Sequence, residues 1–182
     1  MLPSETAPKA RRWWLWLVLS LAVVAADQLT KLAILSMFRP GEERVVTTFF
    51  SIVLAFNTGA AFSFLREAAG WQRYLFSAIA IAAGVLIVWL LKRGGDRWYC
   101  AGLALILGGA FGNLCDRVAL GHVVDFLLVH WDGWYFPAFN VADSAITVGA
   151  GLLILDSFRQ RHADTPHQMQ HLQRGSETQR KP

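Results

Sequence analysis

Four long apolar blocks dominate this chain and limit what it can fold into. Each is long enough, or nearly so, to cross a hydrocarbon layer, which takes about 20 apolar residues in a helix. The blocks run from Trp13 to about Phe38, from Trp71 to Leu91, from Trp98 to about Val118, and from Phe139 to Phe158. Only 16% of the 182 residues are charged, which is unusually low for a soluble protein. We therefore predict a mainly α membrane protein with four transmembrane helices.

The distribution of Lys and Arg between the blocks predicts the orientation of the chain. Basic residues precede the first block, fill the second connection and follow the fourth block: Lys9, Arg11, Arg12, Lys92, Arg93, Arg97, Arg159 and Arg161. The third connection, residues 119–137, contains no Lys or Arg, and the first, residues 39–70, balances Arg with Glu. We expect both termini in the cytoplasm and these two connections outside. Because the cations cluster at segment ends, we expect no nucleic-acid partner.

These features divide the chain into three parts. We predict a cytoplasmic N-terminus at residues 1–12, a four-helix membrane domain at 13–158, and a disordered cytoplasmic tail at 159–182, which has almost nothing apolar to bury. The outer connection of about residues 39–70 contains a run of β-branched and aromatic residues, which favours strands. We therefore expect a small extracytoplasmic β-sheet.

A cleavable signal peptide is an alternative interpretation of the first block. The stretch Val24-Ala25-Ala26 imitates a cleavage site after an apolar segment. The helical pattern resumes from Leu32, however, so we interpret the block as a retained membrane anchor.

Charged and amide side chains inside the blocks are the leading functional candidates, because such groups are costly in a membrane. The predicted topology brings them to one layer just beneath the outer surface. Inside the blocks these are Asp27 and Lys31 on the first, Asn113, Asp116 and Arg117 on the third, and Asn140 and Asp143 on the fourth. Asp125, on the connection between the last two blocks, is expected in the same layer. Asp27 with Lys31, Asn113 with Asp116 or Arg117, and Asn140 with Asp143 are three or four residues apart, so each helix presents one polar stripe.

Most of these residues also have a purely structural interpretation. Asp27 and Lys31 share a helix face and can neutralise each other. Asp116 beside Arg117 favours a structural ion pair near a helix end. Spacing alone leaves these alternatives open.

Asp143 and Asp125 differ in how well a purely structural role explains their presence. Asn140 followed by Asp143 is typical of a helix cap with its first-turn acid. Asp125 has the weakest structural explanation, because it lies among apolar residues without an adjacent cation.

Once serine, zinc and cysteine chemistry are eliminated, carboxylates are the reactive groups that this chain offers in the greatest number. The chain has no Gly-x-Ser-x-Gly elbow, and His122 and His130 lack the His-Glu-x-x-His pattern of a zinc protease. Cys115 lies in an apolar helix, where a thiol is usually inert. Two acids that share one apolar site do not both ionise easily, so one keeps a proton at neutral pH. Such a pair at a membrane surface suggests peptide-bond hydrolysis.

Two other classes of protein compete with this hypothesis. A small transporter or proton relay requires acids along a path through the bilayer, whereas we expect the acids of the spans in their outer halves. A non-enzymatic assembly factor would use Asp27 with Lys31, and Asp116 with Arg117, only to hold the bundle together.

Five ordered sequence blocks resemble the signatures of the bacterial lipoprotein signal peptidases, also called signal peptidase II. Together they extend over most of the apolar region, which makes the match specific. They are Asp27-Gln-Leu-Thr-Lys31, Asn57-Thr-Gly-Ala-Ala-Phe62, Gly112-Asn-Leu-Cys-Asp-Arg-Val118, Val123-Val-Asp-Phe126 and Phe136-Pro-Ala-Phe-Asn-Val-Ala-Asp-Ser144.

The resemblance implies an aspartic endopeptidase of the bacterial inner membrane. It would remove signal peptides from diacylglyceryl-modified prolipoproteins, cutting on the N-terminal side of the lipidated cysteine. The family's catalytic pair falls on Asp125 and Asp143. Its supporting positions fall on Asn57, Asn113, Asp116, Arg117 and Asn140, with Asp27 and Lys31 in the first block. We expect the lipidated substrate and membrane lipids as partners, a monomeric chain, and neither a cofactor nor a metal ion.

Overall fold

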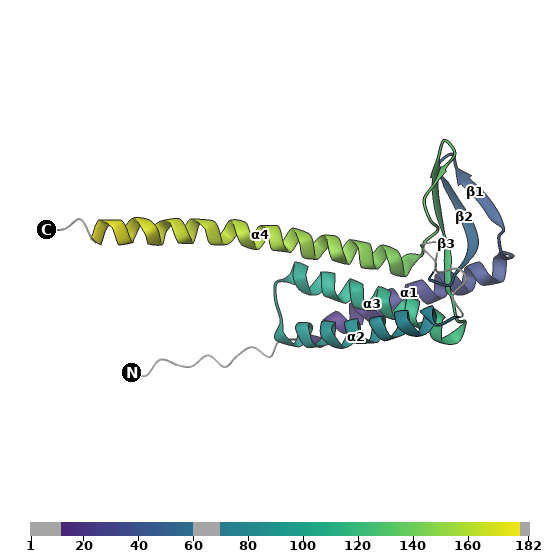
Figure 1. The fold of residues 1–182 in the computed structure, drawn as a ribbon, viewed down its shortest axis with the longest axis horizontal. Helices are drawn as coiled ribbons and strands as arrows, with labels where there is room; N and C mark the ends of the chain where they lie inside the picture. The colour runs from purple at the N-terminus through teal and green to yellow at the C-terminus, as the bar shows by residue number, and fades with distance from the viewer. Residues whose placement is uncertain (1–11, 60–69, 179–182) are drawn as a thin grey trace.

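The described part of the chain consists of four long helices and one small sheet (Figure 1). The computed structural model describes residues 12–59 and 70–178. In chain order the elements are α1 (Trp14–Met37), β1 (Glu43–Thr47), β2 (Phe50–Asn57), α2 (Gln72–Arg93), α3 (Arg97–Ala119), β3 (Val123–Trp131), β4 (Trp134–Tyr135) and α4 (Val141–Thr178). The predicted fold class is confirmed. Residues 1–11, which make up most of the predicted N-terminal segment, lie outside the described residues.

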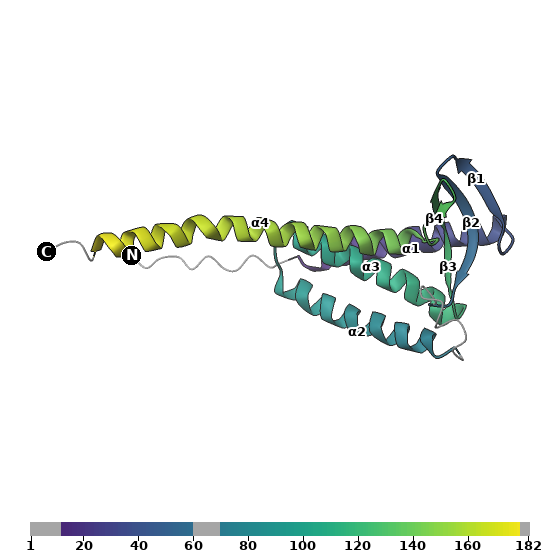
Figure 2. The ribbon, with the colours of Figure 1, turned by 45° about the horizontal axis from the view of Figure 1, so that its top comes forward.

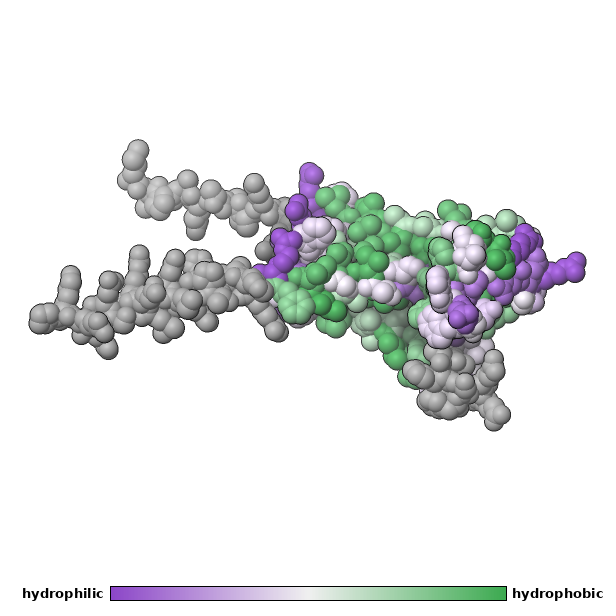
Figure 3. Space-filling model, turned by 90° about the horizontal axis from the view of Figure 1, so that it is seen from above, coloured by the Kyte–Doolittle hydropathy of each residue, from purple (hydrophilic) through white to green (hydrophobic). Residues whose placement is uncertain are grey.

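The surface of the bundle is that of a multi-pass membrane protein. Each of the four helices includes a stretch long and apolar enough to cross a membrane, and in α4 this stretch ends at Arg159. Leu21, Val85 and Ile154 are among the large apolar side chains exposed on the helices. Figure 3 shows hydrophobic surface along the bundle with hydrophilic groups at both ends. This is the pattern expected where lipid, rather than water, surrounds the helices.

Helix α3 is the centre of the bundle and packs against each of the other three helices. Figures 1 and 2 both show it between α2 and α4. A Cβ added at Gly108 would lie 2.7 Å from the Ser20 carbonyl oxygen of α1, and one at Gly149 would lie 2.6 Å from the Gly102 oxygen of α3. Small residues therefore let these backbones approach closely. Gly108 and Gly149 thus mark close contacts of α3 with α1 and of α4 with α3.

The sheet lies at one end of the bundle, away from the distal end of α4 (Figure 1). Its strands are antiparallel in the order β1-β2-β3-β4. The strands predicted for the first connection are β1 and β2. A tight turn at Asp132 and Gly133, both with positive φ, joins β3 to β4, so Asp132 is a turn residue as its sequence context indicates. An apolar cluster fixes the sheet to the end of α1: Ile34, Phe38, Leu54, Val124 and Phe126.

Helix α4 continues to Thr178, far beyond the other helices (Figure 1). Here the structure differs from the expectation of disorder from residue 159 onward. The physical reason is that a helix already formed within the bundle extends without a new nucleus, although Pro166 has no backbone N–H to donate to the preceding turn.

Candidate active site

The start of α4 is held by side chains from two parts of the chain. Asn140 precedes the helix, and its Oδ1 accepts a hydrogen bond from the backbone N of Asp143 at 2.9 Å. Asp27 of α1 accepts a second bond, from the backbone N of Ala142, also at 2.9 Å. These acceptors satisfy N–H groups that have no partner within the helix. The predicted cap at Asn140 is confirmed, and it places Asp143 in the first turn.

Asp125 reaches the same place from the sheet. It lies on β3 opposite Ala55 of β2, and it is buried. Its Oδ1 accepts a hydrogen bond from Nδ2 of Asn140 at 2.7 Å. Burial, and then the negative charge of Asp143, raise the pKa of Asp125 to about 7, although hydrogen bonding from Asn57 lowers it. This carboxyl group therefore keeps its proton to a much higher pH than an ordinary aspartate does.

Asn113 of α3 connects the second carboxylate to the same network. Its Nδ2 donates to Oδ1 of Asp143 at 2.8 Å. Its Oδ1 accepts bonds from Lys31 at 3.0 Å and from Asn140 at 3.2 Å. The two asparagines thus join Asp125 and Asp143 through hydrogen bonds.

A buried ionic cluster supports these asparagines. Nζ of Lys31 lies 2.7 Å from Asp27 Oδ2 and 2.8 Å from Asp116 Oδ2. Asp116 Oδ2 also accepts from the backbone N of Val124 at 3.0 Å, which fixes β3 to α3. All three charged side chains are almost completely buried. Buried charges persist only when they are paired and hydrogen-bonded, as these are.

Gln28 also belongs to this cluster, although it was not predicted from the sequence to be a site residue. Its Nε2 donates to Asp116 Oδ1 at 2.8 Å and to the Gly112 carbonyl oxygen at 3.1 Å. Its position beside Asp27, within a block of the resemblance, was the signal available in the sequence.

The prediction of an ion pair between Asp116 and Arg117 is wrong. Adjacent helix residues point in different directions, and Asp116 pairs with Lys31 instead. Nη1 of Arg117 donates to the Asn113 carbonyl oxygen at 3.3 Å, and its guanidinium lies 5.1 Å from the centre of the Phe76 ring. By contrast, the predicted neutralisation of Asp27 by Lys31 is confirmed.

The expectation that acids are confined to the outer halves of the spans is also wrong. Asp156 lies near the end of the apolar part of α4 that is farther from the sheet, and it is buried. It was not among the residues predicted from the sequence. The predicted site residues on α1, α3, β3 and the start of α4 converge on one network. Asn57, at the end of β2, accepts a hydrogen bond from the backbone N of Gly59 at 2.8 Å.

The fold places this chain among multi-pass membrane enzymes. A solved structure described as a bacterial membrane enzyme, determined by the in meso method at 2.3 Å resolution, is similar with a TM-score of 0.71 and 30% identity. The likeness covers 81% of this chain and 89% of that one. A second structure with the same description, at 1.9 Å, gives a TM-score of 0.70 at 30% identity and covers 78% and 91% of the two chains.

The sequence comparisons define the family. Residues 19–159 match the family model described as Signal peptidase (SPase) II. The lipoprotein signal peptidase of Paraburkholderia phytofirmans is 54% identical over 86% of this chain and 94% of its own. That of Pseudomonas fluorescens is 54% identical over 88% and 95%. The chain belongs to the signal peptidase II family, whose members cleave signal peptides from prolipoproteins. The predicted family and peptidase function are confirmed.

Proposed function

We propose that this peptidase is of the aspartic type, with Asp125 and Asp143 as its catalytic residues. The observation that supports this most is the shared hydrogen-bond network. Asn140 binds Asp125, Asn113 binds Asp143, and the two asparagines bind each other. Two carboxylates from different elements, β3 and α4, are thereby oriented by one connected set of donors, as an acid and base pair requires.

In the proposed mechanism Asp143 is the base and Asp125 the acid. Asp143, in the first turn of α4, takes a proton from water while the water oxygen attacks the scissile carbonyl carbon. Asp125, whose pKa is about 7, gives its proton to the carbonyl oxygen. The tetrahedral adduct then collapses: Asp143 returns its proton to the amide nitrogen, the C–N bond breaks, and Asp125 regains a proton from the hydroxyl group.

We assign the surrounding polar residues to positioning. Asn113 and Asn140 orient the carboxylates, and the cluster of Asp27, Lys31 and Asp116 holds the helices that carry them. Asn57 and Arg117 are proposed to contact the substrate, because each lies beside the carboxylates but outside that cluster. The pKa effect of Asn57 on Asp125 supports its place at the site.

We further propose that the substrate is a diacylglyceryl-modified prolipoprotein, cut on the N-terminal side of the lipidated cysteine. Acyl chains would remain in the bilayer while the scissile bond reaches the carboxylates near its boundary. The position of the network at the sheet end of the bundle supports this arrangement. The placement of basic residues supports cytoplasmic termini, an inner-membrane location and a site near the outer leaflet.

The lipid requirement is tested with two precursors that differ only in the diacylglyceryl group. Purified protein should cleave the lipidated precursor and leave the unlipidated one intact. Asp125→Asn should abolish cleavage, whereas the matched control Asp132→Asn, in the exposed turn, should cleave normally. Equal cleavage of both precursors would overturn the proposed lipid requirement. Normal cleavage by Asp125→Asn would overturn the aspartic mechanism.

A further inference from the structure

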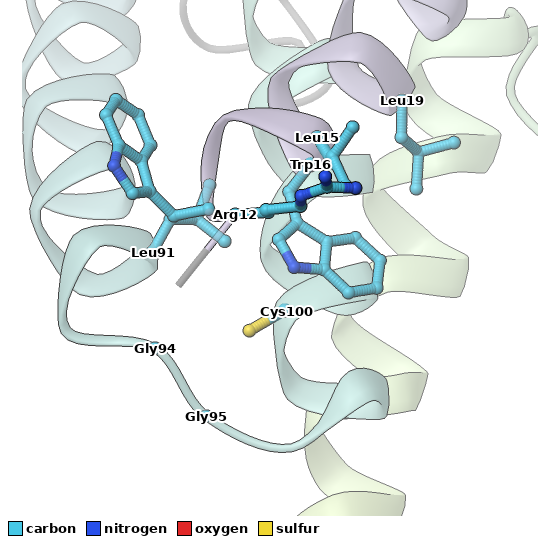
Figure 4. Close-up of a pocket in the computed structure, with 9 residues that line it drawn as sticks. Arg12, Leu15, Trp16, Leu19, Leu91, Gly94, Gly95 and Cys100 are labelled. Atoms are coloured by element: carbon cyan, nitrogen blue, oxygen red, sulfur yellow. The ribbon is translucent and has the colours of Figure 1, made fainter. Parts of the chain in front are cut away.

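A cleft at the opposite end of the bundle from the carboxylates has no part in the proposed peptidase chemistry. It lies between the start of α1, the end of α2 and the start of α3, and its volume is about 460 Å³. Figure 4 shows Arg12 and Trp16 projecting across it, with the Gly94–Gly95 connection below. Since a helix rises about 1.5 Å per residue, Asp27 is roughly 17 Å farther along α1 than Trp16.

The cleft combines apolar walls with a cationic rim. Leu15, Leu19, Leu91 and Cys100 provide apolar walls, and Arg12 provides an exposed guanidinium. The residues lining the cleft include no carboxylate. A ligand that fits such walls needs both an anionic group and an apolar body.

Further positive charge surrounds the mouth of the cleft. Nζ of Lys92 lies 5.2 Å from the centre of the Trp13 ring, which lines the cleft. The carboxylate of the connecting loop, Asp96, accepts a hydrogen bond from the backbone N of Trp98 at 2.9 Å and so caps α3. The mouth therefore attracts anions.

We propose that this cleft binds an anionic phospholipid from the leaflet at this end of the bundle. Arg12 holds the phosphate, because a guanidinium donates two parallel hydrogen bonds to phosphate oxygens. Trp16 adds an indole N–H donor, and one acyl chain lies along the leucines. Basic pockets between transmembrane helices suit lipid head groups in this way. The proposal does not depend on which residues are catalytic.

Native mass spectrometry of the full chain in detergent tests the proposal. The protein is offered equal amounts of phosphatidylglycerol and zwitterionic phosphatidylethanolamine with the same acyl chains. Wild type should retain phosphatidylglycerol preferentially. Arg12→Gln should lower the ratio of retained phosphatidylglycerol to phosphatidylethanolamine by roughly fivefold, which is the effect of one cation near an anionic lipid. Arg12→Lys should lower it less.

Arg159→Gln is the matched control. It removes the same charge at the same end of the bundle, but Arg159 lines a separate cleft with Trp98, Leu155 and Phe158. This variant should change the ratio by less than about twofold. An equal loss of the lipid ratio in both glutamine variants would show that retention depends only on general surface charge, and it would overturn the proposal. Displacement of the lipid by millimolar glycerol 3-phosphate would overturn it as well, since the site would then serve soluble phosphates. Thermal unfolding of each variant verifies that it is folded.

Discussion

Asn140 uses both ends of its amide to join the sheet to α4. Its Nδ2 donates to Oδ1 of Asp125 at 2.7 Å, while its Oδ1 caps the helix by accepting from the backbone N of Asp143 at 2.9 Å. Rotation of the amide by half a turn would break both bonds. One buried side chain therefore fixes the carboxylate of Asp125 relative to the start of the helix that carries Asp143.

Replacing Asn140 separates its structural role from its role at the carboxylates. Asn140→Ala removes the cap and the bond to Asp125, so we expect the free energy of unfolding to fall by about 1–3 kcal/mol and cleavage to fall with it. Asn140→Ser keeps a capping hydroxyl but does not reach Asp125. It should regain part of the thermal stability and none of the cleavage rate. If serine restored cleavage together with stability, Asn140 would be only a cap.

Removing the buried cation at Lys31 should destabilise the bundle strongly. Lys31→Met leaves the carboxylates of Asp27 and Asp116 buried without their partner, and losing one member of such a pair costs about 3–5 kcal/mol. Arg44→Gln, which breaks the more exposed pair with Glu42, is the control and should cost less than about 1 kcal/mol. Thermal unfolding in one detergent compares them. Similar melting points for the two variants would contradict this role for Lys31.

Two glycines on α4 make a matched test of helix packing. A Cβ at Gly149 would lie 2.6 Å from the Gly102 carbonyl oxygen and 2.8 Å from the side chain of Ile106, whereas a Cβ at Gly151 would meet nothing within 4 Å. We expect Gly149→Ala to lower stability by about 1–3 kcal/mol. Gly151→Ala should be neutral or slightly stabilising, since alanine favours helix. The melting temperatures should diverge accordingly, and equal values would show that α3 and α4 are not in close contact at Gly149.

The raised pKa of Asp125 predicts how stability depends on pH. Its pKa rises from 3.8 to about 7 on folding, so between these values the folded protein holds a proton that the unfolded chain has released. The contribution of Asp125 to the free energy of unfolding is therefore fully present below about pH 4. As the pH rises through 7 this contribution is lost, which lowers the free energy of unfolding by up to about 4 kcal/mol. The melting temperature of wild type should fall over this range relative to that of Asp125→Asn. Parallel curves for the two proteins would contradict the raised pKa.

The sequence predicted the spans and the polar layer because both depend on local patterns. Runs of about 20 apolar residues define membrane helices, and the three- or four-residue spacing of Asn140 with Asp143 defines a cap and a shared face. Asp125 was a functional candidate because it lies among apolar residues without an adjacent cation, and the resemblance supplied its pairing with Asp143.

Contacts between residues on different helices and strands could not be predicted in the same way. The pairing of Lys31 with Asp116 joins α1 to α3, and the bond from Ala142 to Asp27 joins residues 115 positions apart. Only the packing of the bundle creates such contacts. Strand β3 was also missed, because a short apolar run such as that from Val123 does not by itself distinguish strand from helix.

A double-mutant cycle on cleavage tests whether Asp125 and Asp143 act together. Asp125→Asn, Asp143→Asn and the double variant are compared on one lipidated precursor, with thermal unfolding to verify that each is folded. Residues that act as one unit are strongly non-additive, so each single variant should lose roughly a thousandfold or more in rate and the double variant no more than either single. A single variant that keeps wild-type cleavage, or losses that multiply in the double variant, would contradict the account.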